Sequence, residues 1–203
     1  NADINLNIYK HVRQSINMKN QTAVILLSSG TTGIPKGCEI TQHNMVACIS
    51  AYQKRTKFLK KFKDESIVLN MTPWFHVMGL VNIFSILLIK TYSTVFLPRF
   101  DPKLFFDAIE KYEVISVSIP PPVVVFISKT PLIHNYDLSS LRVIFCGAAP
   151  LKQETEEQVK DLFKRRIFVL QAYGMTETTA GIIASFAGNE APGSIGEVEE
   201  GIY

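Results

Sequence analysis

The chain has 203 residues, 47% of them hydrophobic, and a formal net charge of +3. This hydrophobic content excludes an intrinsically disordered chain and is typical of a globular protein. The apolar run at residues 80–89 contains Asn82 and Ser85 and ends at Lys90, so it is too short to span a membrane and favours a buried helix. Because the chain starts at Asn1 without a methionine, we expect an internal fragment of a longer protein.

Strand and helix patterns alternate along the chain. Strands are expected at residues 22–27, 66–71, 94–97, 114–118, 141–146 and 167–171. Helices are expected at 42–56, 77–89, 102–112, from 123 to about 128, and at 152–164, with Thr41 and Asp101 as N-caps. Short, wholly apolar strands alternating with helices predict an α/β fold, in which helices cover both faces of a parallel sheet.

Basic residues gather in one segment, residues 54–63, without which acidic residues outnumber basic ones. We favour a solvated helix end, because cations suit the negative end of a helix dipole. Phe58, Leu59 and Phe62 interleave with the charges, so a membrane or nucleic-acid patch is a second hypothesis. An anchor for the phosphates of a nucleotide-containing co-substrate such as CoA is a third.

The three cysteines are widely spaced. Cys38, Cys48 and Cys146 form no C-x-x-C pair and no Cys/His cluster at metal-ligand spacing. A sparse, odd set of this kind is typical of a reducing compartment. We therefore expect an intracellular protein.

A Gly/Ser/Thr-rich segment, the phosphate loop at residues 28–37 (SSGTTGIPKG), follows the first apolar run. We expect a buried strand that ends in this loop, whose glycines turn backbone N–H groups toward an anion while its hydroxyls and lysine add further donors. An ordinary linker is the alternative. A Walker A loop is excluded, because Pro35 stands where glycine is needed and Gly37 replaces the metal-binding hydroxyl.

Three further motifs follow predicted strands: residues 72–79 (TPWFHVMG), 146–151 (CGAAPL) and 172–179 (AYGMTETT). Each has a simple structural explanation by itself. The histidine could be satisfied in the core, Gly-Ala-Ala-Pro could be a tight turn, and Thr-Glu could be a helix cap. In open parallel sheets, however, ligands bind beyond the carboxyl ends of the strands, so the three together favour one binding site.

In order and spacing, these four segments resemble the core motifs of the adenylate-forming enzymes, which include acyl-CoA synthetases, coumarate–CoA ligases and beetle luciferases. The resemblance covers essentially the whole chain, and residues 193–196 (GSIG) resemble the glycine motif that follows. It implies that residues 1–203 are a fragment of the large N-terminal AMP-binding domain, without its upstream part and without the mobile C-terminal domain. The short motifs look most similar to the coumarate–CoA ligase, luciferase and medium-chain acyl-CoA synthetase branch.

The resemblance also implies a role for each matching residue. The ATP/AMP site would comprise Ser28, Ser29, Gly30, Thr31, Thr32, Gly33, Lys36, Gly147, Ala148, Ala149, Tyr173, Gly174 and Thr176. The acyl and CoA side would comprise Phe75, His76, Gly147 and Ala172. The catalytic residues would be Lys36, His76, Thr176 and Glu177, with Glu177 also ligating Mg²⁺.

The implied reaction is activation of a carboxylic acid by ATP and Mg²⁺ to an acyl-adenylate, followed by thioester formation with CoA. A carboxylate that attacks a phosphate brings two anions together, so the site must supply positive charge, which Lys36, the loop amides and Mg²⁺ at Glu177 would provide. No side chain need act as a nucleophile, which agrees with the absence of a Ser/His/Asp or Cys/His arrangement.

Two alternatives stay open. One is a luciferase-type adenylating oxygenase, and the other is a non-catalytic nucleotide-binding scaffold. The expected partners are a small carboxylic acid and CoA, with no nucleic acid and no transmembrane segment. The resemblance further suggests fatty acid metabolism and a cytoplasmic or peroxisomal enzyme, and we expect the isolated fragment to be inactive.

Overall fold

The computed structural model describes residues 17–28, 33–62, 66–82, 92–188, 191 and 193–199. In chain order its elements are β1 (Thr22–Ser28), β2 (Lys36–Thr41), α1 (Gln42–Thr56), η2 (Lys57–Lys61), β3 (Ser66–Asn70), β4 (Tyr92–Phe96), α3 (Pro102–Tyr112), β5 (Ser116–Ile119), α4 (Pro121–Lys129), η3 (Pro131–Asn135), β6 (Val143–Gly147), α5 (Gln153–Leu162), β7 (Phe168–Met175), η4 (Thr176–Thr178), β8 (Ala180–Ala184) and β9 (Glu197–Val198), where η marks a 3₁₀ helix.

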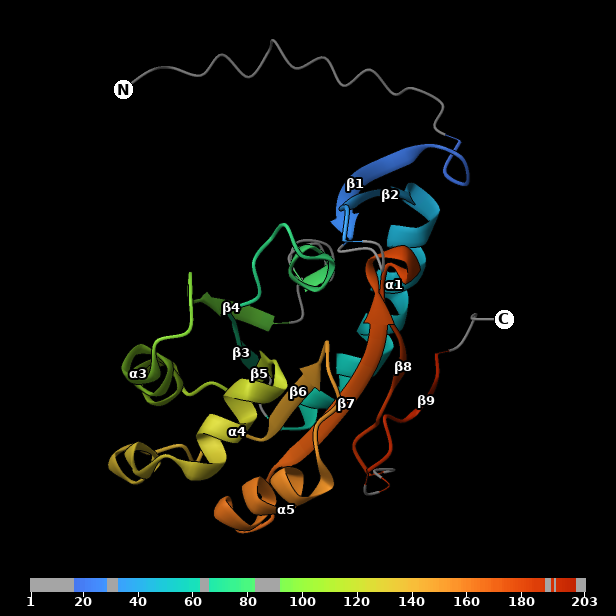
Figure 1. Cartoon of the computed structure of the whole chain (residues 1–203). Coiled ribbons are helices and arrows are strands. Elements are labelled where there is room, and N and C mark those ends of the chain that lie inside the picture. The colour runs from blue at the N-terminus through green and yellow to red at the C-terminus, as the bar shows by residue number, and fades with distance from the viewer. Residues whose placement is uncertain are drawn as a thin grey trace, which may run out of the picture.

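The main sheet runs in the order β4-β3-β5-β6-β7-β8-β9 (Figure 1). Its strands from β4 to β7 pair in parallel, whereas β8 and β9 are added antiparallel to one edge. Parallel strands need long crossovers, and here helices such as α4 and α5 provide them. The predicted α/β fold with a helix-covered, mostly parallel sheet is confirmed.

Alternate side chains of the parallel strands enter two separate cores. In β6, Ile144 and Cys146 belong to the large core under α3, α4 and α5, whereas Val143 and Phe145 belong to a core on the opposite face. Leu59 of η2 fills that second core. Because successive side chains of a strand point to opposite faces, this division shows that both faces of the sheet are covered.

The predicted helix starts are confirmed at two capping residues. The Thr41 hydroxyl accepts a hydrogen bond from the backbone N–H of Asn44, whose side chain accepts one from the Thr41 backbone, so α1 begins with a capping box. Asp101 accepts from the N–H of Leu104 at 2.9 Å, and Pro102 occupies the first helical position of α3. Both helices thus begin where their local sequence directs.

The first strand is not the buried, parallel strand that its apolar sequence predicts. β1 pairs antiparallel with β2 in a separate two-stranded sheet, and Ile25 and Leu27 are 62% and 71% exposed. On the other face of β1, Leu26 and Ser28 are buried, and Leu26 packs in a core with Ile40 and with Ile49 of α1. An apolar run can therefore form a strand that is buried on one face only and exposed to solvent on the other. The partner strand β2 was not predicted, because its glycine and lysine were assigned to the loop.

The last predicted strand is longer than expected. β7 continues past Gln171 to Met175, so Ala172, Tyr173 and Gly174 lie within a strand and not after it. Antiparallel pairing with β8 supports this extension, which the sequence did not predict because β8 is rich in glycine and alanine. Ala172, Tyr173 and Gly174 therefore sit on paired strand backbone, with a shift of register between Tyr173 and Gly174.

The predicted helix at residues 77–89 is described only in its first part, where residues 77–82 are helical; the remainder lies outside the described residues. No helix in the described part of the chain combines the length and apolar character that crossing a membrane requires.

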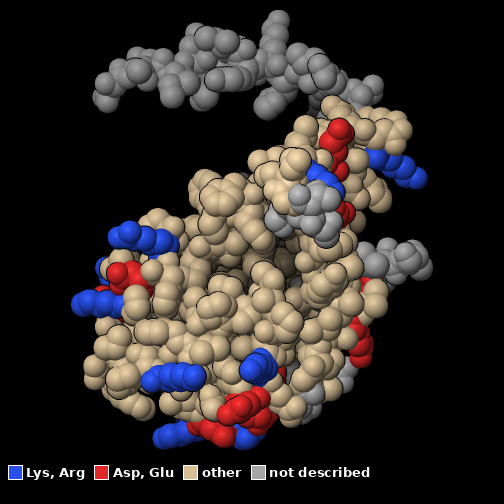
Figure 2. Space-filling view, in the orientation of Figure 1, with Lys and Arg blue, Asp and Glu red and all other residues tan. Residues whose placement is uncertain are grey.

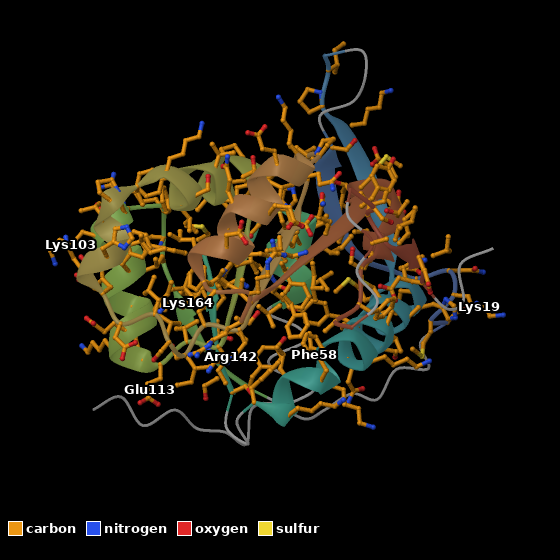
Figure 3. The ribbon with its side chains drawn as sticks, turned by 90° about the horizontal axis from the view of Figure 1, so that it is seen from below. Lys19, Phe58, Lys103, Glu113, Arg142 and Lys164 are labelled. Atoms are coloured by element: carbon orange, nitrogen blue, oxygen red, sulfur yellow. The ribbon has the colours of Figure 1, made fainter. Side chains whose placement is uncertain are left out.

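The apolar residues within the basic segment at 54–63 face the protein. Leu59 is buried, and the Phe58 ring meets that of Phe168 edge-on with centroids 6.5 Å apart. Phe58 lies at the end of the segment formed by α1 and η2 (Figure 3). Because Phe58 and Leu59 are needed to close the second core, they do not form a membrane-facing patch, and the segment fits the solvated helix end that we favoured.

Replacement of Phe106 by alanine should destabilise the fold strongly. Phe106 is fully buried in α3 and stacks on Tyr136 at 5.3 Å between centroids, so its removal should lower the free energy of unfolding by about 3–5 kcal/mol. Leu104, two residues earlier in the same helix, is 53% exposed, and its replacement by alanine should cost less than about 1 kcal/mol. Urea unfolding of both variants measures the difference; equal losses would contradict this packing.

Candidate active site

A cavity of about 430 Å³ lies beside the carboxyl ends of β6 and β7, between the sheet, α1 and residues 77–82. Figure 2 shows that the middle of this face is hollowed and uncharged, with lysine, arginine and acidic residues around its rim. Its lining residues are Ser28, Cys48, Tyr52, His76, Val77, Met78, Val81, Asn82, Ser118, Phe145, Cys146, Ala148, Ala172, Tyr173, Gly174, Met175, Thr176, Glu177, Ala180 and Gly181.

Of the described part of the phosphate loop, Ser28 lines this cavity, whereas Gly33 and Lys36 do not. Ser28 ends β1 and is buried in the cavity wall, and in the hairpin it is paired with Lys36, the exposed first residue of β2. Gly33 has φ +79°, a left-handed conformation that favours glycine. Ser29, Gly30, Thr31 and Thr32 lie outside the described residues.

A tight turn presents the Thr-Glu pair to the same space. In η4, the Thr178 side chain accepts a hydrogen bond from the Met175 N–H at 2.9 Å and donates to the Ala180 carbonyl at 2.9 Å. The Thr178 side chain therefore stabilises the turn, and Thr176 and Glu177 line the cavity. Thr179 has φ +57°, an uncommon conformation for a β-branched residue, and it marks this turn as locally strained.

Glycine is required immediately before this turn. A Cβ on Gly174 would lie 1.7 Å from the Ala180 carbonyl oxygen, which is far inside contact distance. β7 and β8 can approach this closely only without a side chain at Gly174, and the closeness sets the position of η4. Gly174 therefore has a structural role in addition to lining the cavity.

The carboxyl group of Glu177 is held in its charged form. Its pKa lies below the usual range because the nearby Ser28 hydroxyl and its own backbone N–H stabilise the charged form, and because Lys36 lies near enough to add positive charge. The carboxylate is exposed and ready to accept a cation. Segments far apart in sequence thus combine hydroxyls, a carboxylate and an ammonium group at one end of the cavity.

These groups fit a magnesium ion that arrives with its own ligands. Among the described residues there is no group of three His, Cys, Asp or Glu side chains that could hold a metal alone. Mg²⁺ typically takes one or two carboxylates and completes its octahedron with water and phosphate oxygens. Glu177, with the hydroxyl of Thr176 beside it, suits a metal–phosphate complex better than a free ion.

His76 lies on the cavity wall, at the start of the helical segment. Its Nδ1 accepts a hydrogen bond from the Met78 N–H at 3.2 Å, so in the neutral ring the proton resides on Nε2. The turn before it is tight, because a Cβ on Gly79 would lie 2.2 Å from the Pro73 carbonyl oxygen. The neighbouring Phe75 is 79% exposed and is not among the lining residues, so the structure separates this expected pair.

The turn after β6 contributes one of its three expected residues to the wall. Ala148 lines the cavity and has φ +71°, whereas Gly147 and Ala149 do not line it. Gly147 instead lies against β7, where an added Cβ would meet the Ala172 carbonyl oxygen at 3.1 Å. Backbone groups of this turn can still face a flat ligand from beside Tyr173, whose half-exposed ring lines the same cavity.

The glycine motif at residues 193–196 lies away from the cavity. Gly196 has φ +102°, and a Cβ there would lie 1.9 Å from the Ala184 backbone. The Ser194 hydroxyl accepts a hydrogen bond from the Gly196 N–H at 3.0 Å. Within the described residues, this motif allows β9 to pair with β8 and does not line the site.

Comparison with known proteins agrees with this geometry. The sequence model of the family described as "AMP-binding enzyme" matches residues 3–201. The chain belongs to the AMP-binding enzyme family.

Its relatives in this family include a probable 4-coumarate–CoA ligase 1 from Dictyostelium discoideum, 38% identical over 89% of the chain and 32% of the relative. Luciferin 4-monooxygenase from Photuris pensylvanica is 35% identical over 98% of the chain and 36% of the relative. The chain thus spans about a third of the length of these relatives.

Solved structures give the same picture of the fold. An O-succinylbenzoate coenzyme A synthetase from Bacillus subtilis, in complex with ATP and magnesium ion, superposes with a TM-score of 0.73 at 25% identity, over 88% of the chain and 36% of that structure. A red-emitting luciferase from Phrixothrix hirtus gives 0.72 at 30% identity, over 84% and 32%. The predicted membership of the adenylate-forming superfamily is confirmed.

Sequence reasoning missed the deep wall of the cavity in this AMP-binding enzyme. Cys48 and Tyr52 lie one turn apart on α1, and Ser118 and Phe145 face the cavity from β5 and β6. None of these belongs to a motif, because any side chain on the correct face of a helix or strand can line a pocket. One signal was available: Asn82 is, with Ser85, one of two polar residues in the apolar run at residues 80–89.

A buried polar network supports the turn after β6. Gln171 accepts from the Leu151 N–H at 3.2 Å and donates to the Glu156 carboxylate at 3.1 Å. Glu156, only 3% exposed, also accepts from Lys160 at 2.5 Å. The network ties α5 to β7 behind Ala148, so it holds one wall of the cavity in place.

Replacement of Glu156 by glutamine should therefore be costly. The change removes the 2.5 Å partner of the partly buried Lys160 and leaves it only the longer contact to Glu157 at 4.0 Å, so we expect the free energy of unfolding to fall by about 2–4 kcal/mol. Glu157, the next residue, is 33% exposed; it pairs with the exposed Arg165 at 3.0 Å and lies 4.0 Å from Lys160. The same change at Glu157 should cost less than about 1 kcal/mol in the same denaturant titration. A smaller loss at Glu156 than at Glu157 would refute the structural role of the network.

The thiol of Cys146 should resist alkylation in the folded protein. Burial, and the negative charge of Glu156, raise the pKa of this thiol to about 12, so almost no thiolate is present at pH 8. Iodoacetamide labelling followed by peptide mapping should show Cys146 protected in buffer and labelled in urea. Cys38, which is less buried, serves as the internal control; labelling of Cys146 at the rate of Cys38 in buffer would be inconsistent with this environment.

Proposed function

We propose that the protein activates a carboxylic acid with ATP, forming an acyl-adenylate, and then transfers the acyl group to CoA. The observation that carries this proposal is the division of one cavity into two chemical parts. Ser28, Thr176 and Glu177 meet at one end, and an apolar wall that includes Val77 and Val81 extends from them. A polyphosphate with a metal suits the first part, and the hydrocarbon part of an acid suits the second.

In the first step, a carboxylate oxygen attacks the α-phosphorus of ATP, and the bond from that phosphorus to the bridging oxygen of pyrophosphate breaks. Both reactants are anions, so the main task of the residues is to neutralise charge. Lys36, together with the loop amides, would hold the departing phosphates. The Thr176 hydroxyl would donate to the α-phosphate. No group on the enzyme forms a covalent bond with substrate.

Glu177 would hold Mg²⁺ through a carboxylate oxygen. When bound, the ion supplies positive charge to the phosphate oxygens as pyrophosphate leaves. The lowered pKa of Glu177 suits this role, because the carboxylate stays ionised throughout the neutral range.

The nucleoside would lie against the wall formed by β6 and β7. The ring of Tyr173 offers an aromatic face for adenine, and the backbone from Gly147 to Ala149 can approach its edge. Gly174 lines this part of the cavity and would contribute backbone contacts to the nucleotide. These roles, like those of the phosphate loop, come from the family resemblance and remain part of the proposal.

In the second step, the sulfur of CoA attacks the acyl carbonyl carbon, and the bond from that carbon to the AMP oxygen breaks. His76 borders the acyl part, and its Nε2 proton is available to orient a carboxylate or carbonyl oxygen. The exposed Phe75 and Trp74 lie outside the cavity, where they can contact the approaching thiol arm.

A second candidate is an adenylating oxygenase of the luciferase type. The similarity to luciferin 4-monooxygenase from Photuris pensylvanica, at 35% identity, favours it specifically. Both candidates share the adenylation step and differ in what then attacks the acyl-adenylate, CoA or O₂. Light emission with luciferin and ATP separates them, since thioester formation produces none.

Replacement of Glu177 by glutamine should lower kcat at saturating ATP by about tenfold to a thousandfold and weaken the response to Mg²⁺, because an amide is a poorer ligand for a hard cation. The assay is hydroxamate trapping of acyl-adenylates by the full-length protein with a panel of fatty and aryl acids. Glu157→Gln is the matched control, because Glu157 lies in α5 outside the cavity.

Full Mg²⁺-dependent activity in Glu177→Gln would refute the metal assignment alone. The absence of ATP-dependent product with every acid, together with retained ATP binding, would favour the non-catalytic scaffold.

A further inference from the structure

The deep end of the cavity carries an unsatisfied polar group. Asn82 lines the cavity, is only 3% exposed, and its side-chain Nδ2 has no hydrogen-bond partner among the described residues. Buried amide groups are almost always hydrogen-bonded, since burying one without a partner is costly. The amide therefore points to a ligand atom that accepts its hydrogen bond.

Other polar side chains lie beside it. Ser118 and Tyr52 line the same cavity, and both also line a small adjoining cavity of about 10 Å³, as does Asn82 itself. Ser118 faces this side of the sheet because its neighbours Val117 and Ile119 enter the opposite core. The polar floor, comprising Asn82, Ser118 and Tyr52, thus lies on three different elements.

The adjoining cavity leaves little room for the ligand to extend further. Its volume is about that of one water molecule. Tyr92 closes it, and burial together with the adjacent Tyr52 raises the pKa of the Tyr92 phenol, which therefore stays neutral. A ligand that reaches this end of the main cavity would therefore have its last atoms beside the polar floor.

The charge of the lining restricts what can end there. Glu177 is the only residue in the described lining that carries a formal charge at neutral pH when His76 is neutral, and it belongs to the phosphate end. No cation is available among the lining residues to pair with a second carboxylate at the floor. A neutral oxygen acceptor fits the Asn82 amide, whereas a methyl end would leave it unpaired.

We propose that Asn82, with Ser118, selects compact carboxylic acids whose far end bears an uncharged oxygen acceptor, such as a phenol, ketone or alcohol, over the same acids without it. This inference rests on the proposed function, because it takes the carboxylate to lie at the phosphate end. The apolar wall between the two ends, formed by Val77, Val81 and Phe145, fits an aryl or short alkyl spacer. Asn82 is thus a specificity-determining residue.

The test compares three acids that differ only at the far end: phenylpropanoate, its para-hydroxy derivative and its para-acetyl derivative. The intact protein should use the two oxygenated acids with kcat/KM values about tenfold to a hundredfold above that of the plain acid. The acetyl group accepts hydrogen bonds but does not donate them. A preference of the protein for the para-acetyl acid over the plain acid therefore specifically indicates a hydrogen-bond donor on the protein.

The variant Asn82→Leu keeps the volume and removes the donor, so the preference for oxygenated acids should fall to about twofold or reverse. Ser118→Ala should reduce it in part. Val81→Ala is the control, because it enlarges the same cavity without changing its polarity and should alter all three acids alike. If thermal unfolding shows that Asn82→Leu is not cooperatively folded, the effect of Ser118→Ala on the preference for oxygenated acids decides the inference by itself.

Equal use of the three acids by the unmodified protein, or a preference unchanged in the polar-floor variants, would overturn the inference while leaving the proposed function intact. If no acid gives an ATP-dependent product, the proposed function fails, and calorimetric binding of the same acids decides the inference separately. Tighter binding of the oxygenated acids, lost in Asn82→Leu, would support it; equal binding or no binding would overturn it.

Discussion

The site depends on the parallel register of β5, β6 and β7. Ser118 pairs with Phe145, and Gly147 pairs with Ala172, so β5 and β6 end at the same edge, and β7 continues past this edge from Ala172 to Met175. Parallel strands align their carboxyl ends in this way, and the aligned ends of an open sheet form a crevice. Residues more than fifty positions apart in sequence therefore line one cavity.

The close approach of β8 to β7 fixes the position of η4 beside the cavity that the strand register creates. Without a side chain at Gly174, β8 can approach β7 closely, and the chain reverses within the few residues of η4. The reversal leaves the hydroxyl and carboxylate of the Thr-Glu pair directed at the hairpin end that carries Ser28 and Lys36. The cavity thus has a polar end and an apolar wall because of how the chain is folded. Strand ends and turns bring the polar groups to one end, and helix faces supply the apolar wall.

Local rules predicted the parts of the structure that depend on local sequence. The caps at Thr41 and Asp101 and the strand-end positions of His76 and Ala148 were all predictable, because each depends on neighbouring residues or on a motif. The exposure of Leu27 was not predictable, since an apolar run does not reveal how many faces of its strand will be covered. The same limit explains why β2 and β8, which are held by pairing with distant strands, were missed.

The deep wall of the cavity was unpredictable for a related reason, yet under the proposed function it is the part that would distinguish one acid from another. Phosphate chemistry requires particular groups, so its residues recur as motifs; an acyl wall requires only shape, which any side chain on the right face can provide. A polar residue in such a wall is different, because burial makes it costly unless a ligand satisfies it. Asn82 is buried at that cost. A methyl-ended acid would do nothing to offset it, whereas an oxygen at the far end of the acid would turn the unsatisfied amide into a contact that selects the substrate, as we propose.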